Sequence, residues 1–170
     1  MAYIRGASQE ESTADSCLFC GLAGQPASPR TLILEKYRHC FLVLNAFPYA
    51  SGHVMVAPYR HHDSFLGDGV EERAEVQAAL ERARRALARE YRPDGFNAGV
   101  NLGRPAGAGV VGHIHWHLVP RWLGDTNFMP VAAETRVLPE ALSDTYGRLM
   151  QALGQVPDEG LAVEERGSGA

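Results

Sequence analysis

Residues 112–120 have the sequence Gly112-His113-Ile114-His115-Trp116-His117-Leu118-Val119-Pro120, in which three histidines alternate with apolar residues. Because successive side chains of a β-strand point to opposite faces, this alternation predicts a strand with its three imidazoles on one face. Imidazole titrates close to neutral pH, so such a row supplies a nucleophile, a general base, hydrogen-bond donors or metal ligands. The alternative to a functional site is a row of solvated histidines on an edge strand that has no chemical role. The glycine-rich run from Gly103 to Gly112 and the Pro-Arg-Trp after the strand favour a functional site.

The composition of the chain is that of a soluble globular protein of one domain. Of its 170 residues, 45% are hydrophobic and 21% are charged. The formal net charge of −4 argues against an extended nucleic-acid interface, which needs a basic surface, but it allows a small anionic substrate in a locally positive pocket. Met1–Ser16 lacks the apolar segment of a secretory signal, and no apolar run is long enough to span a bilayer. We therefore expect a cytoplasmic protein without membrane contact.

Short apolar runs, bounded by turn residues, predict the strands of an antiparallel sheet. Three runs in succession indicate a meander, and the continuous apolar character of the first two predicts burial on both faces. A fourth run is separated from the histidine strand by the glycine-rich loop, so we expect these two strands to bracket that loop. The expected strands before the histidine strand cover residues 31–35, 41–45, 53–58 and 96–102.

A longer period is present between Val70 and Tyr91, where apolar residues recur every three or four positions. This spacing predicts an amphipathic helix. Its arginines alternate with glutamates, which indicates a solvated face with i, i+4 ion pairs rather than a nucleic-acid patch. A shorter second helix is expected over residues 139–153. The arginines of the long helix are Arg82, Arg84, Arg85 and Arg89.

The predicted elements define an α+β fold, which is an antiparallel sheet of about five strands with one long helix packed on it and a shorter C-terminal helix. We expect one domain over residues 17–153, between a flexible N-terminal arm over residues 1–16 and a flexible C-terminal tail over residues 154–170. Residues 21–30 contain two prolines and two glycines, so we expect a loop there.

Cys17 and Cys20 are separated by two residues, a spacing typical of a zinc knuckle or a redox pair. No thioredoxin-like pattern surrounds them, and a zinc site needs two further ligands, for which the seven histidines are candidates. His61 and His62 follow a predicted strand end, and because neighbouring side chains cannot face the same way, one of them is available as a ligand. Two buried, reduced cysteines without a metal are the alternative.

The run Gly107-Ala108-Gly109 in the glycine-rich loop allows two interpretations. Backbone N–H groups of glycines can approach a ligand closely, and beside imidazoles they form a nest for phosphate oxygens. A plain turn between two strands would use the same residues.

Together these features resemble the histidine triad (HIT) family, whose mark is His-x-His-x-His followed by apolar residues at the end of an antiparallel sheet. The resemblance lies in His113–Val119, in Gly52–Val56 and in Asn45, and it covers nearly all of the predicted domain. Residues 120–128 and 135–140 are similar to the bacterial branch that contains diadenosine tetraphosphate phosphorylases (ATP adenylyltransferases).

The resemblance implies a catalytic set made of His115, His117 and His53. The middle histidine of the triad, His115, is implied to be the nucleophile that attacks the α-phosphorus. It would carry a nucleotidyl-histidine intermediate, which divides one displacement into two. His117 would bond the α-phosphate, and His53 would complete the set.

The resemblance also implies contacts with a nucleotide and with a metal. Asn45 would bind ribose hydroxyls, while Asn101 and the glycine-rich loop would hold phosphate oxygens. Zinc-bearing members hold a structural zinc ion that is closed by four protein ligands. The implied loop residues are Gly107, Ala108 and Gly109. The implied zinc ligands are Cys17, Cys20, His61 and His113, with His62 as the alternative to His61.

One departure from the family bears on the reaction. Hydrolytic members carry Ala-Gly-Gln or Gly-Gly-Gln ahead of the triad, whereas this chain has Ala106-Gly107-Ala108-Gly109. The missing glutamine leaves room for inorganic phosphate as the acceptor, so we expect a phosphorylase that converts diadenosine tetraphosphate and phosphate to ATP and ADP. The alternatives are a hydrolase of dinucleoside polyphosphates or nucleoside phosphoramidates, and a non-catalytic, zinc-stabilised nucleotide-binding module. Because HIT proteins are commonly homodimers, the resemblance also implies a homodimer.

Overall fold

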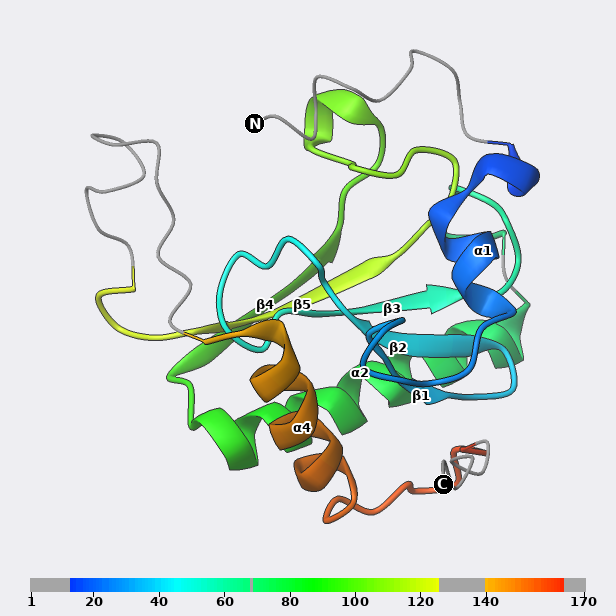
Figure 1. The fold of residues 1–170 in the computed structure, drawn as a ribbon. Coiled ribbons are helices and arrows are strands. Elements are labelled where there is room, and N and C mark those ends of the chain that lie inside the picture. Colours follow the sequence, from blue (N-terminus) through cyan, green and yellow to red (C-terminus); the bar gives the residue numbers. More distant parts are fainter. Residues whose placement is uncertain (1–12, 68, 126–139, 164–170) are drawn as a thin grey trace.

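The computed structural model describes residues 13–67, 69–125 and 140–163, whose fold is shown in Figure 1. Five strands form one antiparallel sheet in the order β1-β2-β3-β5-β4. The predicted α+β fold and the meander of the first three strands are confirmed. The strands are β1 (Ile33–Lys36), β2 (Cys40–Leu44), β3 (Val54–Pro58), β4 (Gly95–Val100) and β5 (Trp116–Arg121). The helices are α1 (Leu18–Ala23), α2 (Val70–Tyr91) and α4 (Leu142–Leu153), with short 3-10 turns at η1 (Ala14–Ser16) and η2 (Arg104–Ala106).

Both faces of the sheet are covered, which explains the continuous apolar runs of β1 and β2. On one face, alternate strand residues such as Leu42 and Val54 pack against α2 and α4. On the other face, Phe41 and Met55 pack against Phe19 of α1. In Figure 1, α2 crosses behind the sheet and α1 lies in front of it. The predicted burial of the first strands on both faces is therefore confirmed.

The long helix α2 has the bounds that the sequence predicts. Val76, Ala83 and Leu87 are buried on its apolar face. On its other side, Glu81 accepts hydrogen bonds from the guanidinium groups of Arg84 and Arg85, as the charge pattern predicts. Burial of the apolar face of this helix closes the larger of the two cores.

The prediction of a solvated face is wrong for Arg82, whose side chain is buried. Its Nε and Nη2 donate to the two carboxylate oxygens of Glu35 at 2.7 and 2.9 Å. The same guanidinium donates to the carbonyls of Leu153 and Val156, and the hydroxyl of Tyr37 donates to Glu35 at 2.7 Å. Because every charged group in this network is paired and hydrogen-bonded, the buried charges are tolerated. The network ties α2 to β1 and to the end of α4.

The expected histidine strand is only partly formed, because β5 begins at Trp116. Of the three histidines, His117 lies in β5, and its partner across the sheet is Met55 of β3. Gly112 has a φ of +86°, and the N–H of Ile114 donates to the carbonyl of His62 at 2.6 Å. This bond joins the residues before β5 to the loop after β3, and His113 and His115 lie outside the ladder.

Two predicted boundaries differ from the structure. The expected loop over residues 21–30 is wrong at its start, because α1 continues to Ala23. After α4, the chain remains packed, because Leu161 is buried in the same core as α2 and α4. The packed part of the chain therefore extends past residue 153. The flexibility of the expected arm and tail stays a prediction, since residues 1–12 and 164–170 lie outside the described part.

Gly52, directly before His53, lies against α2 with a φ of +77°. A Cβ atom at this position would come within 2.7 Å of Leu87 Cδ2 and within 3.4 Å of the side chains of Pro120 and Tyr91. Glycine therefore meets two requirements here, the left-handed backbone and the close approach of the chain to the helix.

Candidate active site and metal centre

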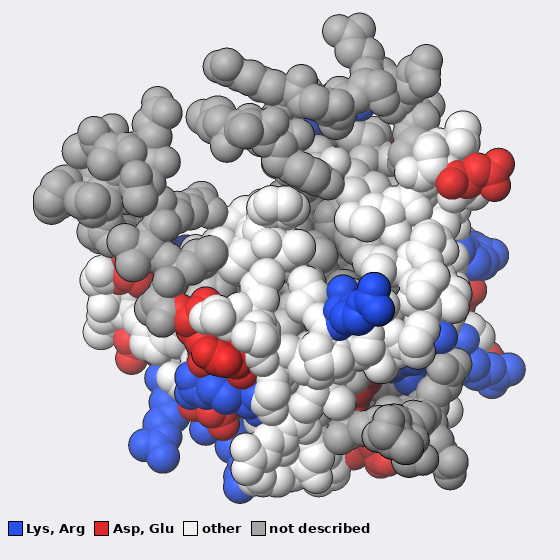
Figure 2. All heavy atoms as spheres, viewed as in Figure 1, with Lys and Arg blue, Asp and Glu red and all other residues white. Residues whose placement is uncertain are grey.

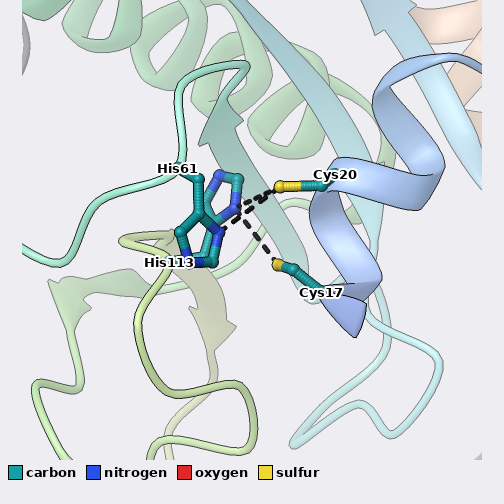
Figure 3. Close-up of side chains that lie close together, drawn as sticks. All are labelled: Cys17, Cys20, His61 and His113. Atoms are coloured by element: carbon teal, nitrogen blue, oxygen red, sulfur yellow. Dashed lines mark hydrogen bonds between the residues drawn. The ribbon is translucent and has the colours of Figure 1, made fainter. Parts of the chain in front are cut away.

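Four possible metal ligands from three separate segments converge beside the sheet. Cys17 and Cys20 come from the start of α1, His61 from the loop after β3 and His113 from the segment before β5, as Figure 3 shows. Their ligand atoms all lie within 4.8 Å of one another. The Sγ of Cys17 is 3.3 Å from His113 Nδ1, and the Sγ of Cys20 is 3.4 Å from His61 Nδ1. The structure thus brings together the four residues that the resemblance implies.

The hydrogen bonding of His113 leaves one of its ring nitrogens for a metal. Its Nε2 lies 2.9 Å from the carbonyl oxygen of Pro58, and because a carbonyl can only accept, Nε2 carries the proton. Nδ1 therefore presents its lone pair to the two thiols. Metal-ligating histidines are commonly oriented by such a second hydrogen bond. Two thiols and two imidazoles suit tetrahedral Zn²⁺, so the residues fit this metal.

The electrostatics of the cluster also favour a cation. Burial, followed by the hydrogen bond and charge of Cys17, raises the pKa of the Cys20 thiol to about 11. Burial lowers the pKa of His113 to about 4, which keeps this imidazole neutral. A bound divalent cation stabilises thiolates, so it offsets the cost of ionising the buried Cys20 thiol. It also binds neutral imidazoles, which is the form that burial gives to His113.

His61, rather than His62, is the neighbour that faces the cluster. The ring of His62 lies against Gly67, where a Cβ atom would come within 2.1 Å of His62 Nδ1. The two adjacent histidines therefore point to different surroundings, as their adjacency predicts. We take His61 as the fourth candidate ligand.

His115 is buried, with 4% of its surface exposed. Its Nδ1 lies 2.8 Å from the carbonyl oxygen of His113, so Nδ1 carries the proton and Nε2 keeps the lone pair. Burial lowers the pKa of His115, which keeps the ring neutral at neutral pH. A neutral imidazole with its lone pair on Nε2 is the form that nucleophilic attack requires.

His117 and His53 form a chain of hydrogen bonds with a defined direction. The N–H of Tyr49 donates to His53 Nδ1 at 3.1 Å, so the proton of His53 is on Nε2. His53 Nε2 lies 3.0 Å from His117 Nδ1 and donates to it, which leaves the proton of His117 on Nε2. Among the described residues, no group bonds this buried Nε2 atom. It is therefore a buried donor placed for a ligand.

The rings of His115 and His117 are in contact, with centroids 4.9 Å apart. Burial, and to a smaller extent the charge of His115, lowers the pKa of His117 to about 4. Both rings are thus neutral at neutral pH. They differ in their tautomers, because the first offers a lone pair at Nε2 and the second offers a proton at Nε2.

The amide residues lie beside the histidines and the loop. Asn45 Oδ1 accepts from the N–H of Phe47 at 2.9 Å, and its Nδ2 is 3.4 Å from His53 Nδ1. Asn101 lies beside the glycine-rich loop, since its Nδ2 would be 3.7 Å from a Cβ atom at Gly107. Gly107 has a φ of +93°, which accounts for glycine there. The expected contacts with ribose and phosphate, including those of Ala108 and Gly109, stay predictions.

Two aromatic residues of the site were not found from the sequence. The ring of Phe19 contacts His115 and His113, with centroids 4.6 and 5.3 Å away. The ring centroid of Tyr49 lies 4.6 Å from that of His53, and the backbone N–H of Tyr49 fixes the tautomer of that histidine. The position of Phe19 between the two cysteines is a signal that could have indicated it. No pattern marks Tyr49, because the group that fixes the tautomer belongs to its backbone.

On the face of the molecule that Figure 2 shows, uncharged side chains cover much of the middle, a basic group stands among them, and further acidic and basic side chains lie toward the edges. The described residues form no continuous basic patch on this face. In the described part of the chain, no helix has the length and apolar character needed to cross a bilayer.

Comparison with known proteins identifies the class of protein. A family profile for the HIT domain matches residues 25–122, and the chain therefore belongs to the HIT family. Among curated relatives, the AP-4-A phosphorylase of Mycobacterium tuberculosis (strain ATCC 25618 / H37Rv) is 40% identical over 114 residues, which are 67% of this chain. The match spans 58% of the length of that relative. An uncharacterized 16.1 kDa HIT-like protein of Mycoplasma pneumoniae is 31% identical over 115 residues, 67% of this chain and 78% of the relative.

Solved structures have the same fold. A Zn-bound histidine triad family protein from Mycobacterium smegmatis is similar, with a TM-score of 0.65 and 26% identity over 84% of this chain and 96% of the other. A hypothetical histidine triad nucleotide-binding protein from Sulfolobus tokodaii has a TM-score of 0.62 and 22% identity, covering 82% and 90% of the two chains. These likenesses agree with the family match and place the chain in the HIT fold.

Proposed function

We propose that this protein is a nucleotidyltransferase that cleaves dinucleoside polyphosphates by phosphorolysis, through a nucleotidyl-histidine intermediate on His115. The observation that carries the proposal is the hydrogen bonding of two touching rings, which assigns a lone pair to His115 Nε2 and a proton to His117 Nε2. One ring is suited to attack phosphorus, and the other is suited to donate to a phosphate oxygen. The name of the M. tuberculosis relative supports diadenosine tetraphosphate as the substrate.

In the first step, His115 Nε2 attacks the α-phosphorus. An N–P bond forms, the bond from phosphorus to the bridging oxygen breaks, and the leaving group takes the electron pair. From diadenosine tetraphosphate this leaving group is ATP. No proton has to leave Nε2 before the attack, and the positive charge that develops on the ring is stabilised by the Nδ1–H bond to the His113 carbonyl.

In the second step, an oxygen of inorganic phosphate attacks the phosphorus of the intermediate. The N–P bond breaks, its electron pair returns to His115 Nε2, and ADP is released. His117 donates its Nε2–H to a phosphate oxygen in both steps, which stabilises the charge that builds up there. Asn101 and the amides of Gly107, Ala108 and Gly109 are the proposed contacts for the other phosphate oxygens, and Asn45 is the proposed ribose contact.

We infer that a structural Zn²⁺ ion is held by Cys17, Cys20, His61 and His113. With four protein ligands the site has no open position, so the ion would supply cross-linking rather than chemistry on the substrate. It would join α1 to the segment that leads into β5. The Zn-bound M. smegmatis relative supports this proposal.

We further propose that the protein is a homodimer in the cytoplasm. Within the described chain β4 pairs with β5 alone, so its other edge is open for a strand of a second subunit, and Asn97 and Ala98 are exposed there. A cluster that needs reduced thiols suits a reducing compartment. Sedimentation analysis would give the mass of a dimer, and charged substitutions on β4 would reduce it to that of a monomer.

The deciding experiment is product analysis of diadenosine tetraphosphate turnover with and without inorganic phosphate, with His115→Ala as the control. Formation of ATP and ADP that depends on phosphate and is lost in the variant is the expected result. ATP and AMP without phosphate would establish a hydrolase instead. Nucleotide binding without turnover under both conditions would establish a binding module.

A further inference from the structure

The ring of Phe19 is placed between the cysteine–histidine cluster and the nucleophile. It is 1% exposed, and its centroid lies 4.6 Å from that of His115 at an interplanar angle of 38°. The same ring lies 5.3 Å from His113, one of the candidate metal ligands. In the sequence Phe19 lies between Cys17 and Cys20, so a single short segment carries two ligands and the contact with the nucleophile.

A single hydrogen bond does not fix the orientation of His115. The bond from Nδ1 to the His113 carbonyl sets the tautomer, but it leaves the ring able to tilt about that bond. Aromatic faces in contact restrict such tilting, and Phe19 covers one side of the ring while the edge contact with His117 limits another. An error of about 1 Å in the position of a reacting atom can lower a rate about a hundredfold. The contact with Phe19 therefore bears directly on catalysis.

The position of Phe19 depends in turn on the cluster. Helix α1 has six residues, which is far below the length at which an isolated helix is stable in water. It must be held by its anchors, and two of them are the thiols of Cys17 and Cys20. Binding of these thiols therefore adds to the core packing with Phe41 and Met55 that holds Phe19 against His115.

We propose that Phe19 is a positioning residue, whose ring orients the imidazole of His115 and transmits to it the order that metal binding gives to α1. This inference rests on the proposed role of His115 as the nucleophile. It assigns the metal centre a second effect besides stability, because loss of the metal disturbs the nucleophile through the Phe19 contact in addition to the hydrogen bond from His115 Nδ1 to the His113 carbonyl.

The test compares Phe19→Leu with Phe41→Leu. Phe41 is as buried as Phe19 and belongs to the same small core, and its recorded ring contacts are with Phe19 and Tyr59 rather than with His115. Phe19→Leu is expected to lower the single-turnover rate of nucleotide transfer to His115 about ten- to hundredfold, with KM changed less than kcat. Phe41→Leu is expected to lose similar stability and to keep that rate within about twofold. Equal rates for the two variants would overturn the proposal.

A second readout needs no substrate. The NMR resonances of the His115 ring should shift on Phe19→Leu, and removal of zinc from the wild-type protein should move them in the same direction, while Phe41→Leu leaves them in place. Unchanged His115 resonances on zinc removal would overturn the link to the metal. If wild-type protein shows no turnover of diadenosine tetraphosphate, the proposed function fails, but these resonances still decide the role of Phe19. If Phe19→Leu does not fold, Phe19→Met, which keeps the volume without an aromatic ring, replaces it.

Discussion

The Nε2 of His53 lies 3.0 Å from the Nδ1 of His117, and it donates to that atom because its own Nδ1 accepts from the N–H of Tyr49. The residue directly before β3 thereby decides which nitrogen of a β5 residue carries the proton. Antiparallel pairing of the two strands, with Met55 opposite His117, brings the two rings together. The proton on His117 Nε2 thus depends on the pairing of β3 with β5 as well as on the triad itself.

His53→Leu removes the donor that fixes the His117 tautomer, so we expect kcat to fall about ten- to hundredfold. His53→Gln should retain most of the activity, because a glutamine amide can accept from Tyr49 and donate to His117. Steady-state kinetics with diadenosine tetraphosphate and phosphate measure both. Equal losses in the two variants would show that His53 acts through packing rather than through its hydrogen bonds.

The free energy of unfolding should depend on pH through His117. Burial, with a smaller effect of His115, lowers its pKa to about 4 in the folded state, against an ordinary value of 6.5. Between these values the unfolded chain binds more protons, so stability is complete above about pH 6.5 and falls as the pH decreases toward 4. The slope is at most about 1.4 kcal/mol per pH unit for this one group. Urea titrations at several pH values should give a smaller slope for His117→Asn, and an unchanged slope would contradict the assignment.

Metal analysis should find one zinc ion per chain in the wild-type protein. Cys20→Ser and His61→Ala each remove one ligand of the cluster, so we expect the zinc content to fall sharply in both. His62→Ala is the matched control. The ring of His62 lies against Gly67 rather than facing the cluster, so this variant should keep its zinc. Loss of zinc from His62→Ala with retention in His61→Ala would show that His62, and not His61, is the zinc ligand.

The buried ion pair of α2 predicts a contrast between two neighbouring arginines. Arg82→Met leaves the carboxylate of Glu35 buried without its partner, so we expect a loss of about 3–5 kcal/mol. Arg84→Met removes a pair whose side chains are both more than 40% exposed, so we expect a loss of at most about 1 kcal/mol. Denaturant unfolding measures the two variants, and similar losses would show that burial of the pair with Glu35 does not make it more important for stability.

Much of the fold could be predicted from the sequence because burial leaves regular patterns. The period of three to four residues gave the bounds of α2, and the apolar runs located all the strands to within a few residues. Arg82 was missed because charge patterning describes a helix surface and says nothing about a carboxylate from a distant strand. The start of β5 was missed because the chain before it bonds to a distant segment, from the N–H of Ile114 to the carbonyl of His62, and such contacts leave no mark in the local sequence.

The candidate site was predictable in its residue types and less so in its arrangement. Cys17, Cys20, His61 and His113 meet as the family resemblance implies. The protonation of the histidines was not predictable, since it depends on the carbonyls of Pro58 and His113 and on the N–H of Tyr49, which are backbone groups. Backbone groups have no signature in a sequence, so tautomers become visible only when the chain is folded.

The close approach of Gly52 to Leu87 connects α2 to the hydrogen-bonded histidines on the opposite side of the sheet. His53 follows Gly52 directly, so the position of its ring depends on the distance between the backbone at Gly52 and the side chain of Leu87. A change of side-chain size at Leu87, remote from any nucleotide, is therefore expected to alter the His53 to His117 separation, which the ring resonances of both histidines would report. If the proposed function holds, the same change at Leu87 is expected to alter the rate although this residue lies on the other face of the sheet from His53.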